Sequence, residues 1–146
     1  VYHLGDIAVY FAKPAKRADE AIFEILNALH GHLVLIKGNH DRRELFKYLA
    51  AHNYDLNGQP KFSFHDVGAL IKYNHCQYYL THYPMMLGIA PRIIHHYAVP
   101  VKENVNVGID SPELEYLKKR PAFGEPLTLA EVETIARIKA EKLTRH

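Results

Sequence analysis

Three consecutive polar residues, Asn39, His40 and Asp41, carry side chains that can bind metal ions or transfer protons. They follow the apolar run 33–36, which is rich in β-branched residues and predicts a strand buried on both faces. A helical pattern then runs from residue 42 to about residue 52. The three polar residues therefore lie on a strand-to-helix turn, where open α/β sheets place their ligand sites.

The same turn has a purely structural interpretation. Asn39 and Asp41 are residue types that cap helices, and for Asp41 we expect a capping role at the following helix. Capping makes no use of an imidazole, so the Asn39-His40 pair favours a chemical role.

Other candidate side chains also follow apolar, strand-like segments. Asp6 comes after such a segment, and His82 ends another, because Pro84 prevents the chain from continuing directly into a helix. One or both of His95 and His96 belong to a third. Oxygen and imidazole ligands of this kind suit hard and borderline divalent ions. We expect these residues to gather at one edge of the sheet.

Composition restricts the class of protein. The chain has 146 residues, of which 48% are hydrophobic and 23% charged, as expected for a globular protein with a real core. A net charge of +2 is too small to indicate nucleic-acid binding by itself. No apolar run is long enough for a membrane span, and no signal peptide opens the sequence. Cys76 is the only cysteine, which favours a reducing cytoplasm.

The first half of the sequence predicts a βαβ unit with parallel strands. A helix is expected over residues 19–30, with Gly31 at its C-terminal end. A short strand-like segment precedes it, and the strand 33–36 follows it. The expected apolar face of this helix consists of Ala18, Ile22, Ile25, Leu26 and Leu29.

The second half predicts sequential strands joined by tight turns. Residues 57–60 are expected to form a loop, and 74–75 a turn. Two further strands are expected over 93–99 and 105–109. Helix starts are marked by Ser111-Pro112 and by a capping box of Thr128 with Glu131. We interpret residues 1–146 as a single domain.

The predicted cluster suits two-metal chemistry. The neutral carbonyl oxygen of Asn39 fits between two cations that already share a carboxylate. Two ions about 4 Å apart would hold a phosphate group and lower the pKa of a bridging water. His40, next to a ligand, could protonate a leaving alkoxide.

The motifs Gly5-Asp6, Gly38-Asn39-His40-Asp41 and Thr81-His82-Tyr83-Pro84, in this order, resemble the calcineurin-like metallophosphoesterases of the bacterial type. The resemblance covers residues 1 to about 110 and implies a four-layer α/β/β/α sandwich, with mixed sheets flanked by helices. It also implies two divalent metal ions, Mn, Fe or Zn, and hydrolysis of a phosphate mono- or diester such as a nucleotide.

The resemblance implies a role for each matching residue. Asp6 bridges the metals, Asn39 and His82 bind the second ion, and His95 is a further ligand. His40 contacts the phosphate and acts as the acid, oriented by Asp41. The candidate substrate-binding residues are Asn39, His40, Arg42 and Tyr83.

The chain departs from the family pattern in two places. The Asp-x-His motif expected before Gly5-Asp6 is not in the sequence, so the first strand is expected to be missing and the domain N-terminally incomplete. Only Ile94-His95 stands where Gly-His-x-His belongs.

Alternatives stay open beside this reading. An inactive binding module of the same fold and a nucleic-acid-binding protein are the other two hypotheses. Arg42 and Arg43 could bind phosphate or simply form a solvated helical turn.

Overall fold

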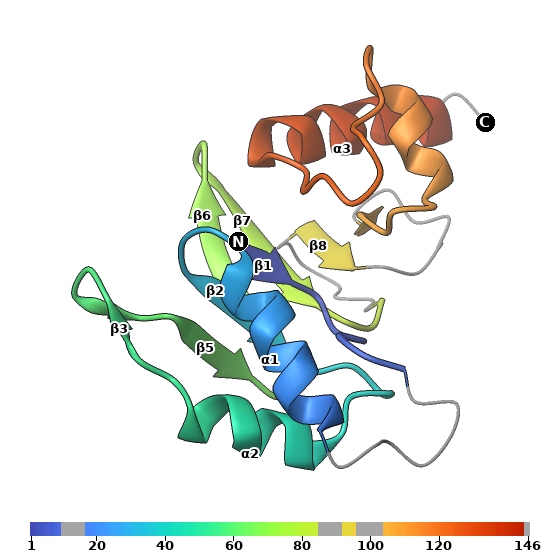
Figure 1. The fold of residues 1–146 in the computed structure, drawn as a ribbon. Helices are drawn as coiled ribbons and strands as arrows, with labels where there is room; N and C mark the ends of the chain where they lie inside the picture. The colour runs from blue at the N-terminus through green and yellow to red at the C-terminus, as the bar shows by residue number, and fades with distance from the viewer. Residues whose placement is uncertain (10–16, 85–91, 96–103, 145–146) are drawn as a thin grey trace. The chain divides into compact units, whose positions relative to one another are not determined.

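The fold is mixed α/β (Figure 1). The computed structural model describes residues 1–9, 17–84, 92–95 and 104–144. The chain divides into two compact units, Val1–Val67 and Gly68–His146. That residues 1–146 form a single domain stays a prediction. Over the described ranges, no helix combines the length and the apolar character needed to cross a membrane.

The first unit is built on a parallel sheet with the strand order β1-β2-β5. Helix α1 lies between β1 and β2 in the sequence, so the predicted βαβ unit is confirmed. The bounds of its elements are β1 Tyr2–His3, α1 Ala18–Ala28, β2 Leu33–Ile36, α2 Arg43–Ala51 and β5 Phe62–His65.

Leucines from both helices and from β2 form the core of the first unit. Leu26 of α1 and Leu45 and Leu49 of α2 are buried, the last two one helical turn apart. They pack in one cluster with Leu33 and Leu35 of β2 and Phe62 of β5. Burying apolar side chains of this size stabilises a fold by about 1.5–3 kcal/mol each. The helices are therefore held on the sheet mainly by apolar packing.

The expected apolar face of α1 is partly wrong. Leu26 is buried and Ile22 packs against the core, but Ile25 is 66% exposed. One residue along a helix turns the side chain by about 100°, which carries Ile25 away from the face that Leu26 occupies. Leu29, expected on the same face, follows the last helical residue and is 48% exposed.

A buried lysine fixes the end of α1. The side chain of Lys61 is 2% exposed, and its ammonium group donates to the carbonyl oxygens of Leu29 and Gly31. A cation at this position satisfies carbonyls that the helix leaves unpaired and interacts favourably with its dipole. The helix ends earlier than expected, with Leu29 as its C-cap, so Gly31 does not cap it; Gly31 lies two residues beyond, with a φ of 73°.

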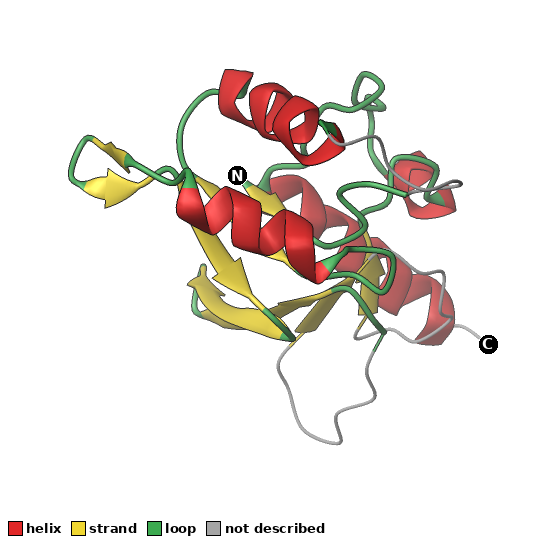
Figure 2. Cartoon of the chain, turned by 60° about the horizontal axis from the view of Figure 1, so that its bottom comes forward, coloured by secondary structure: helices red, strands yellow, loops and turns green. Residues whose placement is uncertain are grey.

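The segment expected as a loop at residues 57–60 is part of a β-hairpin. Strands β3 Asp55–Leu56 and β4 Gln59–Pro60 pair antiparallel across Asn57 and Gly58. Both turn residues have positive φ, 55° and 84°, as a two-residue hairpin turn requires. The hairpin stands out from the rest of the first unit (Figure 2).

The second unit contains a four-stranded mixed sheet with the order β6-β7-β8-β9. Strands β6 and β7 pair antiparallel across Asn74 and His75, and the predicted turn there is confirmed. The other two pairs are parallel. The strand bounds are β6 Gly68–Tyr73, β7 Cys76–Thr81, β8 Arg92–His95 and β9 Asn104–Asn106.

Strand β9 is shorter than the sequence predicted. It was expected to include residues 107–109, but it ends at Asn106. The side-chain oxygen of Asn106 accepts a hydrogen bond from the backbone N–H of Gly108 at 2.9 Å, and this local bond turns the chain. The strand expected over 93–99 is described as far as His95, and its later residues lie outside the described ranges.

Both predicted helix starts in the second unit are confirmed. Ser111 accepts from the N–H of Glu113 at the start of the 3-10 helix η1, Pro112–Tyr116. Thr128 and Glu131 form the capping box of α3, Leu129–Thr144. Hydrogen bonds from the backbone N–H and the hydroxyl of Thr128 lower the pKa of Glu131. These hydrogen bonds stabilise the fold above the pKa that Glu131 has in the unfolded chain. The stabilisation is lost as pH falls through the lower pKa that Glu131 has in the folded chain.

A buried ion pair connects η1, α3 and β9. The ammonium group of Lys139 lies 2.5 Å from a carboxylate oxygen of Glu113 and donates to the carbonyl of Asn104 at 2.8 Å. The other Glu113 oxygen accepts from the N–H of Asn106 at 3.0 Å. Both charged side chains are almost fully buried, so each needs the opposite charge of the other to offset the free-energy cost of its burial.

We predict that Lys139→Met destabilises the chain by about 3–5 kcal/mol, because it leaves the Glu113 carboxylate buried without its cation. The matched control is Arg137→Met, on the same helix, which removes only an exposed pair with Glu141. This control should change the free energy of unfolding by less than about 0.5 kcal/mol. Urea unfolding measures both variants, and similar small losses for the two would contradict the prediction.

Candidate active site

The chain turns sharply at Gly5 and Asp6, directly after β1. Both residues have left-handed backbone conformations, with φ of 95° and 55°. Glycine adopts this region without strain, and Asp is one of the few other residues that tolerate it.

The carboxylate of Asp41 joins this turn to the segment that follows β2. One oxygen accepts from the N–H groups of Asp6 and Gly38, at 2.9 and 2.8 Å. The other accepts from the N–H of Ile7 at 2.7 Å. Asp41 is 6% exposed, so these three charge-assisted hydrogen bonds are sheltered from water.

This arrangement brings two predicted site residues, Asp6 and His40, into contact. The backbone N–H of His40 donates to a carboxylate oxygen of Asp6 at 3.1 Å. Strands β1 and β2 are parallel neighbours, so both turns leave the sheet at the same edge. Asp6 is thereby brought beside the Asn39-His40 pair, as the sequence predicted, and Asn39 and His40 are exposed at this edge.

The expectation that Asp41 caps the following helix is wrong. Helix α2 begins at Arg43, its N-cap residue is Arg42, and no side chain makes a capping hydrogen bond there. The physical reason is that three backbone N–H groups outside the helix already engage the Asp41 carboxylate. Orientation of the His40 ring by Asp41 stays a prediction.

Arginines follow this turn. The side chain of Arg42 is partly exposed and lies 3.8 Å from the carboxylate of Glu44. This is a long, solvent-accessible ion pair, of a kind that contributes little to stability. Arg43 is exposed in the first turn of α2. Arg42 thus stays a candidate for binding phosphate.

The other predicted site residues belong to the second unit. His82 is fully buried after β7, and its ring lies edge-on to that of Tyr83, with centroids 4.8 Å apart. Tyr83 is half exposed. The backbone of His95 is in β8, paired in register with Asn106. His96 lies outside the described residues.

The donor chemistry of the first unit fits part of a divalent-metal site. Asp6 offers a carboxylate and the neighbouring Asn39 an amide oxygen, both suitable for hard or borderline cations. Within the described ranges, no group of three or more His, Cys, Asp or Glu side chains is close enough to hold an ion.

Sequence reasoning missed the connection made by Asp41. Its bond to Gly38 spans only three residues. Its bonds to Asp6 and Ile7 cross 35 and 34 residues and have no local signal.

No family model, curated protein or solved structure matches the chain.

We predict that Asp41→Asn destabilises the chain by about 2–3 kcal/mol, because an amide NH₂ replaces an oxygen that now accepts from N–H groups. The matched control is Asp66→Asn, an exposed carboxylate in the same unit, with an expected change within about 0.5 kcal/mol. Denaturant unfolding measures both. If the two variants were equally stable, the three hydrogen bonds of Asp41 would not be important for the fold.

Proposed function

We propose that the chain is a calcineurin-like metallophosphoesterase that hydrolyses a phosphate mono- or diester. One observation carries the proposal: the Asp41 carboxylate ties the turn of Asp6 to the turn of Asn39 and His40. The Gly-Asp and Gly-Asn-His-Asp motifs thus meet at one edge of the sheet, which is the arrangement that a shared site needs. The four-layer sandwich is part of the same proposal.

The proposed ligands come from the motifs and from this geometry. Asp6 and Asn39 would hold Mn, Fe or Zn through oxygen atoms, and Asp6 would be the bridging carboxylate. His82 and His95, in the second unit, are retained on the sequence motif alone. Divalent ions bound there would supply a water of lowered pKa and neutralise phosphate charge.

The protein side chains have separate tasks in this proposal. His40 gives a proton to the oxygen of the leaving group in this proposal, which is supported by its exposed side chain and by the contact of its backbone N–H with the Asp6 carboxylate. Asp41 is a positioning residue, since its carboxylate contacts only backbone N–H groups in its three hydrogen bonds. Arg42 would bind the phosphate in place of its weak pair with Glu44. Tyr83 would line the substrate pocket.

A binding module without catalysis is the second candidate. It is motivated by the Gly-His-x-His motif, of which only Ile94-His95 stands in this sequence. The two candidates differ in turnover, because a module that only binds phosphate esters would not hydrolyse them.

We predict that Asp6→Asn loses bound manganese and activity together. Asparagine tolerates the positive φ of this position and can still accept from the N–H of His40, so the fold should be retained. Metal content by elemental analysis and turnover of an aryl phosphodiester measure the effect, with Asp66→Asn as the control. Unchanged metal content in Asp6→Asn would contradict its role as the bridging ligand.

We predict that His40→Ala keeps its metal and loses about 10²–10⁴-fold in kcat. Its backbone N–H still reaches Asp6, so the turn should be unchanged. An alkyl ester, which leaves as a poor alkoxide, should lose more rate than an aryl ester. The measurement is kcat for both esters with metal content alongside. Equal losses on both esters, together with loss of metal, would make His40 a ligand instead.

A further inference from the structure

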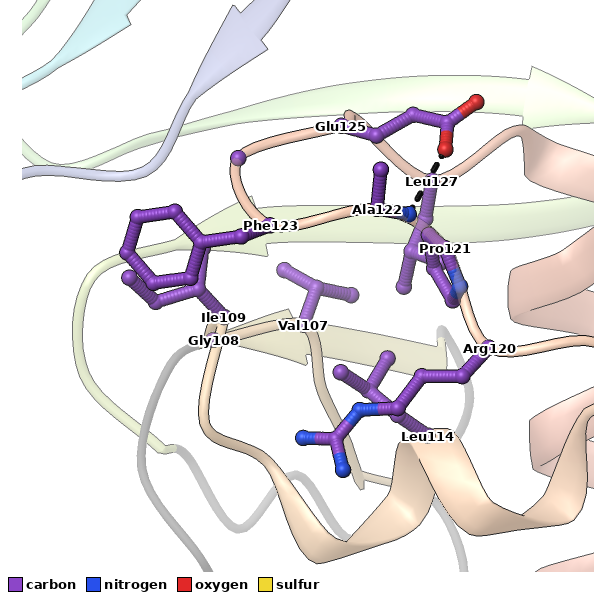
Figure 3. Close-up of a pocket in the computed structure, with 11 residues that line it drawn as sticks. Val107, Gly108, Ile109, Leu114, Arg120, Pro121, Ala122, Phe123, Glu125 and Leu127 are labelled. Atoms are coloured by element: carbon purple, nitrogen blue, oxygen red, sulfur yellow. Dashed lines mark hydrogen bonds between the residues drawn. The ribbon is translucent and has the colours of Figure 1, made fainter.

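The second unit has a hollow of about 250 Å³ between the end of β9 and the loop before α3 (Figure 3). It lies wholly within this unit and is separate from the Asp6 turn. The larger apolar side chains that line it come from Val107, Ile109, Leu114, Phe123 and Leu127. The volume is somewhat below that of pockets for drug-sized ligands, so it suits one or two amino-acid side chains.

The apolar surface continues outside the hollow. Phe123 is 90% exposed and Ile109 is 56% exposed, and both line the hollow. Gly124, next to Phe123, has a φ of 78°, and the Glu125 carboxylate accepts from the N–H of Ala122 at 2.8 Å. The loop that carries Phe123 is therefore a turn held by its own hydrogen bond. An almost fully exposed phenyl ring beside an apolar hollow is typical of a surface that binds another protein.

The charges of this surface indicate the chemistry of the partner. Lys118, Lys119 and Arg120 are consecutive and exposed. Arg120 lines the hollow, and Figure 3 shows its side chain extending toward Leu114, whereas the Glu125 carboxylate is turned to Ala122. A guanidinium group beside apolar walls favours a ligand that combines an apolar side chain with carboxylates.

We propose that this hollow binds a peptide segment of a partner protein in which a large apolar residue is flanked by acidic residues. The apolar residue would contact Leu114 and Phe123, and a carboxylate beside it would pair with Arg120. A second copy of this chain is the other occupant that the test below distinguishes.

The test is selection of random dodecapeptides, displayed on phage, against the whole chain. The selected peptides should share an aromatic residue or leucine close to Asp or Glu. Affinity of the synthesised consensus peptide, measured by fluorescence anisotropy, should fall at least tenfold in Arg120→Glu and in Phe123→Ala. The matched control is Lys72→Glu, an exposed cation of β6 outside the hollow, which should bind as the wild type does.

Three outcomes would overturn the proposal. They are selection of no binding peptide, selected peptides without acidic residues, and affinity that is unchanged in both Arg120→Glu and Phe123→Ala. Self-association of the wild-type chain that disappears in Phe123→Ala, measured by sedimentation, would assign the hollow to a second copy instead. Turnover of phosphate esters is not a readout of this test, so failure of the proposed function would leave its result unaffected.

Discussion

The buried carboxylate of Asp41 holds together the part of the first unit that carries chemistry. Sheltered from water, it needs hydrogen bonds in place of hydration, and it obtains them from the N–H groups of Asp6, Ile7 and Gly38. These donors belong to the turns after two neighbouring parallel strands. One side chain therefore satisfies three polar groups and fixes the distance between two turns.

The conformation of Asp6 depends on this arrangement. A φ of 55° is uncommon outside glycine, although Asp tolerates it, and here the surroundings hold it in place. Here the N–H of Asp6 is held by Asp41, and its carboxylate accepts from the N–H of His40. The proposed phosphoesterase activity uses this same rigidity, since a metal ligand and a general acid must keep their relative positions through the reaction.

Local sequence patterns predicted the helices, strands and turns, but they predicted the long-range contacts less well. The βαβ unit, the turn at Asn74-His75 and the capping box of Thr128 with Glu131 follow from residues close in sequence. The sequence also predicted that Asp6 and His40 approach each other. The role of Asp41 could not be predicted, because an aspartate before a helix looks like a cap until its distant partners are known. The hollow beside Phe123 likewise depends on how β9 ends, and the strand-like pattern of residues 105–109 did not predict that end.

Amide hydrogen exchange, followed by NMR, tests the role of Asp41 most directly. The amides of Asp6, Ile7 and Gly38 should exchange slowly in the wild type and lose protection together in Asp41→Ala. The amide of Lys37, which donates to the carbonyl of His65 within the sheet, should stay protected in both proteins. If the three amides of the wild type exchanged as fast as unprotected ones while Lys37 was protected, the Asp41 carboxylate would not join the two turns.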